Sequence, residues 1–220
     1  MNARKRRSDY GTIQTTDRDI TLLTWIAEQY AIRFDQLHYL VNRYKGEEVS
    51  ESNIKALINR WRRADWVDKR KIVYGEPGWV WVTKDGLKAM ELPYPQWEPK
   101  PGRMAHIHAV NAVRLFVESQ AEMGASWTSE RQINLARKAA DRKHKVDGEV
   151  NYQGNLVAIE VELTQKSADR LQSVLQELSQ KYPAIWYFLD ENCYAPVAEA
   201  IHAFPGSQQK FVVYKLSQIL

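Results

Sequence analysis

Hydrophobic and polar positions in the first part of the chain, up to about residue 92, alternate with helical spacing. A first helix is predicted to begin at Thr16-Asp17, where a hydroxyl oxygen and an early acid suit the unpaired N–H groups of a helix start. A second helix is predicted over residues 34–41 after a short break. The apolar stripe of the first helix is Ile20, Leu23, Ile26, Ala27 and Tyr30.

A third helix, predicted to begin near Ser50 or Ser52, separates apolar from polar residues. At ~100° per residue the two sets lie on roughly opposite faces, so one face is expected to pack on the first two helices. The other face carries Lys, Asn and Arg side chains, which suit DNA phosphates and base edges. The apolar set is Ile54, Leu57, Ile58 and Trp61, and the polar set is Ser52, Lys55, Asn59, Arg62 and Arg63.

A β-hairpin with basic and aromatic side chains is predicted next, with strands over 69–74 and 79–82 and a turn over 75–78. A short helix follows, ending near Leu92. Three helices and a hairpin are typical of a winged helix-turn-helix, whose third helix enters the major groove of double-stranded DNA. An alternative is a winged helix used for protein contacts or dimerisation. The predicted DNA contacts are Ser52, Lys55, Asn59, Arg62, Arg63, Lys69, Arg70 and Lys71.

The domain organisation follows from a proline-rich stretch, since residues 92–102 hold four prolines in eleven positions. We therefore predict a flexible basic arm over 1–15, a winged helix over 16–92, a linker over 93–103 and a second domain over 104–220. In the second domain, helices are expected over 104–123, 166–182 and 196–203. Strands are expected over 126–130, 146–150, 156–162, 184–189 and 211–214. This order predicts an α+β or α/β chain with one mixed sheet and helices on its faces.

Charge and composition narrow the function classes. The first 92 residues hold 17 Lys and Arg against 13 Asp and Glu, and the remainder holds 14 against 14, so the net charge of +4 lies in the first part. That distribution favours nucleic acid as a partner, although it also suits a solubility role. The single cysteine, Cys193, excludes a disulfide framework and suits a reducing cytoplasm. No apolar run approaches the ~18 residues that span a bilayer, so no membrane partner is expected.

Carboxylates set in an apolar strand are the main candidates for chemistry. Side chains alternate along a strand, so Glu160 and Glu162 share one face, and Asp147 on the preceding strand is expected opposite Glu160. Buried carboxylates are costly unless they are paired, hydrogen-bonded or bound to a cation. The arrangement suits Mg²⁺, with Asp147 and Glu160 as candidate ligands. DNA binding by the first domain requires no cofactor.

A metal-free alternative is open for the same acids. Glu160 and Glu162 would then pair with Lys145, Lys166 or Arg170, and Asp147 would cap a turn with Gly148. His106 and His108 are two residues apart on a predicted helix, so they do not share a face and are poor candidates for a paired metal site.

The order of elements, with an acid opening the second strand and Glu-x-Glu closing the third, resembles the PD-(D/E)xK nuclease fold. On that resemblance Asp147 matches the metal-binding aspartate and Glu160 the glutamate. Glu162 stands where the family has its lysine, and Lys166 is the candidate substitute. If the protein is a nuclease, the resemblance predicts Asp147, Glu160, Glu162 and Lys166 as its catalytic set. Glu118 or Glu130 would be the extra acid that some members carry.

The whole chain resembles the replication-relaxation family of plasmid and mobile-element proteins. The shared motifs are Thr16-x-Arg18-Asp19 with Leu22-Leu23, Gln36-Leu37, Val82-Thr83-x-x-Gly86, Asp147, Glu160-x-Glu162-x-Thr164 and Tyr182. This resemblance implies a bacterial cytoplasmic protein, associated with nucleoid or plasmid DNA, that acts in replication, transfer or transcription control.

Three functions stay open at the level of sequence. The first is a DNA-binding accessory or regulatory protein whose nuclease-like domain is inactive. The second is a Mg²⁺-dependent DNA endonuclease that uses the acids. The third is a dimeric regulator whose second domain only assembles partners. The sequence leaves open a homodimer and contacts with replication or transfer proteins.

Overall fold

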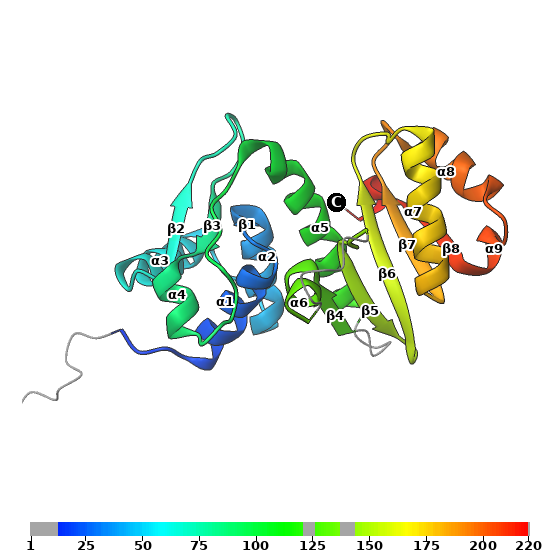
Figure 1. Ribbon diagram of the computed structural model, residues 1–220. Coiled ribbons are helices and arrows are strands. Elements are labelled where there is room, and N and C mark those ends of the chain that lie inside the picture. Colours follow the sequence, from blue (N-terminus) through cyan, green and yellow to red (C-terminus); the bar gives the residue numbers. More distant parts are fainter. Residues whose placement is uncertain (1–12, 121–125, 137–143, 220) are drawn as a thin grey trace, which may run out of the picture. The chain divides into compact units, whose positions relative to one another are not determined.

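The computed structural model describes residues 13–120, 126–136 and 144–219 (Figure 1). The chain divides into two compact units, Met1–Glu98 (unit 1) and Pro99–Leu220 (unit 2). Both helices and strands contribute to each unit, so the predicted mixed class is confirmed. In the described ranges, no helix combines the length and apolar character needed to cross a membrane. Most of the arm predicted over 1–15 lies outside the described residues.

Unit 1 is a helical region with a small antiparallel sheet. Its elements are α1 (Asp17–Glu28), β1 (Ile32–Arg33), α2 (Phe34–Lys45), α3 (Glu51–Arg63), β2 (Val67–Arg70), β3 (Trp79–Val82) and α4 (Lys84–Ala89). Among the described residues, the strands follow the order β1-β3-β2. Trp61 and Trp79 are the largest of its fully buried side chains.

Local signals explain the helix starts in unit 1. Thr16 and Asp19 form a reciprocal capping box at the start of α1, and the Ser50 hydroxyl accepts a hydrogen bond from the Asn53 N–H at the start of α3. Gly46 ends α2 in the left-handed conformation that glycine adopts most readily. This helix is four residues longer than predicted, because the polar residues after Val41 continue it.

The hairpin prediction is wrong in its first strand. Residues 67–70 pair with the four residues of β3, so no partner in β3 is left for residues 71–74, which form part of the connecting loop. Strand β1, which the sequence presented only as a break between helices, pairs with Trp79 and Val80. In α1, Ile20 is exposed, whereas Leu22 and Trp25 are buried, so the predicted stripe is rotated slightly.

Unit 2 is built on a mixed sheet. Its elements are α5 (Pro101–Ser119), β4 (Ser126–Ser129), α6 (Glu130–Ala136), β5 (Gly148–Tyr152), β6 (Asn155–Glu162), α7 (Ala168–Lys181), β7 (Ala184–Leu189), α8 (Tyr194–Ala203), α9 (Ser207–Lys210) and β8 (Phe211–Lys215). Within the described part of the chain, five strands follow the order β4-β5-β6-β7-β8. Strand β5 pairs antiparallel with both β4 and β6, whereas β7 pairs parallel with both β6 and β8.

Helices cover both faces of this sheet. Helices α7 and α8 pack on the face that carries Ala158, Ile185 and Tyr187, and they lie side by side in Figure 1. Helix α5 packs through Val113 and Val117 on the opposite face, which carries the odd-numbered residues of β6. Because β6 is covered on both faces, a charged residue near its end has little access to bulk water.

Several features of unit 2 differ from the sequence prediction. Helix α5 begins at Pro101, since proline suits the first helical position, so residues 101–103 are not linker. The β5–β6 turn is Gln153-Gly154, both with positive φ, rather than Gly154-Asn155. The short helices α6 and α9 were not predicted. The predicted end of the first helix near residue 123 lies outside the described residues.

Candidate functional site

The three predicted acids and Lys166 line one pocket in unit 2. It has a volume of about 510 Å³ and lies at the C-terminal end of β6, next to the segment that leads into β5. Its other lining residues come from the first turns of α5, from the segment before β5, from the end of β6 and from the segment after β6. They are Gly102, Ala105, His106, His144, Lys145, Val161, Leu163 and Thr164.

Asp147 is fixed at the edge of this pocket by three hydrogen bonds. Its backbone N–H donates to the Ile159 carbonyl at 3.0 Å, which continues the β5–β6 register by one residue and sets Asp147 opposite Glu160. Its Oδ2 accepts the Val161 N–H at 2.8 Å, and its Oδ1 lies 2.8 Å from His106 Nε2. The metal-free alternative supposed that Asp147 caps a turn with Gly148, but the carboxylate instead bonds to Val161 and His106.

Glu160 is the most deeply buried of the acids, with 2% of its surface exposed. Its Oε1 lies 2.9 Å from His144 Nε2. Burial raises the pKa of Glu160, and the neighbouring Asp147 charge raises it further, although the hydrogen bond with His144 opposes both. Glu160 is thus poised to hold a proton more readily than an exposed glutamate.

Glu162 forms an ion pair with Lys166, as the metal-free alternative expected. Lys166 lies just before α7, so its side chain reaches the pocket from a loop. Burial lowers the pKa of Lys166, while the charges of Glu160 and Asp147 act in the opposite direction. Lys166 therefore lies within electrostatic reach of all three carboxylates.

His106 and His144 are the pocket residues that the sequence did not assign. His106 reaches Asp147 from α5, across 41 residues of sequence. Burial lowers the pKa of His106, but the hydrogen bond and charge of Asp147 outweigh burial, and the net pKa is raised. The only sequence signal for His144 was its position three residues before Asp147. Glu118 binds Arg114 and Glu130 lies near Arg103, and neither of these acids lines the pocket.

The acids offer the oxygen ligands that Mg²⁺ prefers, but their present partners are basic groups. Asp147 faces His106, Glu160 faces His144, and Glu162 faces Lys166. Among the described residues, no group of three His, Cys, Asp or Glu side chains is arranged to hold a metal ion. The side chains as arranged form three acid–base pairs.

The second candidate site is the polar face of α3 in unit 1. The predicted contacts Ser52, Lys55, Asn59, Arg62 and Arg63 are all exposed. The buried residues of the helix are Ile54, Leu57, Ile58 and Trp61, as its periodicity predicted. Helix α3 therefore presents a continuous polar and basic face.

The predicted contacts differ in whether their side chains already have a partner within the chain. In the described part of the chain, the side chains of Asn59, Arg62, Arg63 and Lys71 form no hydrogen bond or ion pair. Lys55 forms an exposed ion pair with Glu51 at 2.7 Å, and Arg70 lies 3.1 Å from Asp68. The Ser52 hydroxyl lies 2.9 Å from that of Ser50. Exposed pairs of this kind are weak, so they leave the cations accessible to an anion.

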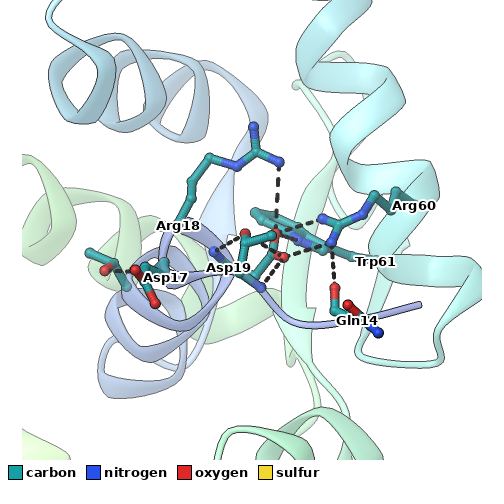
Figure 2. A network of polar contacts seen from close by, with 8 residues as sticks. Gln14, Asp17, Arg18, Asp19, Arg60 and Trp61 are labelled. Carbon is teal, nitrogen blue, oxygen red and sulfur yellow. Dashed lines mark hydrogen bonds and ion pairs between the residues drawn. The ribbon is translucent and has the colours of Figure 1, made fainter. Parts of the chain in front are cut away.

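A buried network fixes α3 to the start of α1 (Figure 2). Asp19 is fully buried, and its carboxylate accepts two hydrogen bonds from the Arg60 guanidinium at 2.7 Å and one from Trp61 Nε1 at 2.8 Å. Arg60 also donates to the Gln14 carbonyl at 2.9 Å. The backbone N–H and the hydroxyl of Thr16 both donate to the Asp19 carboxylate. Burial raises the pKa of Asp19, but the hydrogen bonds outweigh it and hold the pKa well below its usual range.

Two residues of the Thr-x-Arg-Asp motif, Thr16 and Asp19, take part in this network, and Arg60 has a different role from its neighbours on α3. Arg60 points inward to Asp19, whereas Arg62 and Arg63 are exposed on the polar face. The helix is thereby fixed in one rotation.

Neither a scan of family models nor searches among curated proteins and solved structures finds a match to this chain.

Proposed function

We propose that unit 1 is a winged helix-turn-helix domain that binds double-stranded DNA through α3. The observation that carries the proposal is the exposed polar and basic face of α3, which the Asp19–Arg60 network fixes in orientation. Asn59 is the proposed base-reading residue, Lys55 is a further proposed DNA contact, and Arg62 and Arg63 are proposed phosphate contacts. The sheet order β1-β3-β2 supports this fold, with residues 71–78 as the wing.

Unit 2 is, in this proposal, a PD-(D/E)xK-like domain that does not cleave DNA. The three acid–base pairs support this assignment, because each carboxylate already has a cationic or N–H partner. The resemblance to the replication-relaxation family extends the proposal to an accessory or regulatory protein of a plasmid or mobile element.

One observation favours a second candidate, a Mg²⁺-dependent DNA endonuclease. All four residues that the resemblance assigns to catalysis line the same pocket. In such an enzyme, a metal ion would have to replace His106, His144 or Lys166 as the partner of a carboxylate. Lys166 would then be the nearest basic group to the acids.

Two assays test these proposals. The variant Asn59→Ala/Arg62→Ala/Arg63→Ala should lose DNA affinity at least tenfold, and each lost phosphate contact should lower the salt slope by about 0.9. Arg43→Ala, on the basic last turn of α2, is the control. An unchanged affinity of the triple variant would exclude α3 as the reading helix.

The second assay separates a binding protein from a nuclease. Supercoiled plasmid is incubated with the wild type and with Asp147→Ala, in Mg²⁺, in Mn²⁺ and in chelator. Shifted but uncut plasmid in every lane is the expected result. Metal-dependent nicking that disappears in Asp147→Ala would establish the endonuclease instead.

A further inference from the structure

Phe34, the first residue of α2, carries two lysine ammonium groups over its ring. Lys55 Nζ lies 5.7 Å and Lys69 Nζ lies 5.2 Å from the ring centroid. The two lysines come from α3 and β2, so tertiary packing brings them together. Phe34 is half-buried, and its backbone N–H donates to the Gly78 carbonyl at 2.9 Å, which holds the start of α2 beside the end of the hairpin loop.

The cluster of Phe34, Lys55 and Lys69 concentrates like charge. Burial lowers the pKa of Lys69, and the charges of Lys55 and Arg62 lower it further. The two ammonium groups repel each other unless a nearby carboxylate neutralises one of them. Glu51 pairs with Lys55 on an exposed helix face, where such a pair contributes little.

Asp68 does not neutralise Lys69 either, although it is the adjacent residue. Its carboxylate accepts the backbone N–H of Lys69 at 2.7 Å, and its other oxygen lies 3.1 Å from Arg70 Nη2. The ammonium group of Lys69 therefore lies over an aromatic ring, near two other cations. An anion placed between the two lysines would relieve this repulsion and accept hydrogen bonds from both ammonium groups.

We infer that Phe34, Lys55 and Lys69 form one binding position for a single phosphate group of the DNA backbone. Phe34 is a positioning residue, because cation–π attraction holds the two ammonium groups over one ring so that they converge on one anion. The DNA ligand rests on the proposed function of unit 1, whereas the anion position rests on the cluster alone.

The salt dependence of DNA binding tests whether the phosphate is shared. The full chain is compared with Lys55→Met, Lys69→Met and the double variant, and Lys88→Met on α4 serves as a control that removes the same charge elsewhere. One shared phosphate predicts that the double variant loses about 0.9 from the salt slope and roughly tenfold in affinity. Two separate phosphates would lower the slope by about 1.8, which would overturn the inference.

Inorganic sulfate tests the anion position without DNA. Sodium sulfate replaces sodium chloride at constant ionic strength, and amide chemical shifts are followed in the full chain. The expected result is a saturable change at Phe34, Lys55 and Lys69 that is absent from the double variant. Absence of this change overturns the inference even if DNA binds. A sulfate response without any DNA binding would keep the anion position and refute the proposed function.

The role of Phe34 is tested by two substitutions. Phe34→Tyr keeps the aromatic face and should retain the sulfate affinity of the wild type within about twofold. Phe34→Leu keeps an apolar side chain but removes the ring, and should weaken sulfate binding several-fold, because the cation–π attraction for the two ammonium groups is lost. Equal losses in the two variants would contradict the positioning role.

Discussion

Both units bury carboxylates, and the partners of those carboxylates differ. In unit 1, Asp19 is bound by a guanidinium, an indole N–H and a hydroxyl, and this network joins two helices. In unit 2, Asp147 and Glu160 face imidazoles and line an open pocket. Arginine keeps its charge at all accessible pH values, whereas histidine gains or loses a proton near neutrality.

This difference separates a structural acid from acids that can exchange partners. Asp19 has no access to solvent and its pKa is lowered, so it stays ionised and bound. Glu160 is almost as deeply buried, but its pKa is raised, and it lines a pocket of about 510 Å³. The unit 1 network is therefore expected to stabilise the fold, and the unit 2 cluster to respond to protons and ligands.

The largest predicted effect is on the unit 1 network. Asp19→Ala should lower the free energy of unfolding of unit 1 by about 3 kcal/mol, because it leaves the Arg60 guanidinium and the Trp61 N–H without their acceptor. Tryptophan fluorescence during urea unfolding reports this, since six of the eight tryptophans lie in unit 1. Asp17→Ala, two residues away and exposed, should have a much smaller effect. Equal effects would show that Asp19 acts only as a helix-start acid.

A smaller effect is expected from breaking one acid–base pair in unit 2. His144→Ala should destabilise unit 2 by about 2 kcal/mol at pH 8, because the buried Glu160 carboxylate loses its partner. Hydrogen exchange of peptides from β5 and β6 measures the loss. The double variant His144→Ala/Glu160→Gln should recover part of it, since the amide carries no charge. His202→Ala, an exposed histidine on α8, is the control.

If the double variant is as unstable as the single one, the cost of His144→Ala comes from packing and not from an unpaired carboxylate. The unit 2 acids would then differ less from Asp19 than their pKa directions indicate.

The smallest predicted effects are opposite responses to pH. The pKa of Asp19 is lowered on folding, so its stabilisation is present above the unfolded pKa of about 3.9 and is lost as pH falls below it. The pKa of His106 is raised on folding, so its stabilisation is present below the unfolded pKa of about 6.5 and is lost as pH rises through the folded value.

Unfolding free energies measure both slopes. The wild type is compared with Asp19→Asn between pH 3 and pH 6, and with His106→Gln between pH 5.5 and pH 8.5, ranges that bracket the respective unfolded pKa values of about 3.9 and 6.5. The advantage of the wild type should grow with pH in the first comparison and shrink with pH in the second. Differences that change in the same direction would contradict the contrast between the two networks.

Local periodicity predicted those parts of the molecule that depend on neighbours in sequence. The apolar and polar residues of α3 separate as expected, because positions on a helix face repeat every three or four residues. The shared face of Glu160 and Glu162, and Asp147 opposite Glu160, follow from strand alternation and from a two-residue turn. The strand over 69–74 was wrong because its pairing depends on the length of β3.

By itself, the sequence determined the longer helices, the pairing of β5 with β6 and the set of candidate acids, since these follow from backbone geometry and from side chains a few residues apart. Only the tertiary structure decided that Asp19 meets Arg60 and that Asp147 meets His106, each pair 41 residues apart. The physical reason is that such contacts depend on how whole helices pack against their neighbours. Packing uses the buried apolar face of each helix, and it brings together polar residues whose spacing in the sequence carries no signal.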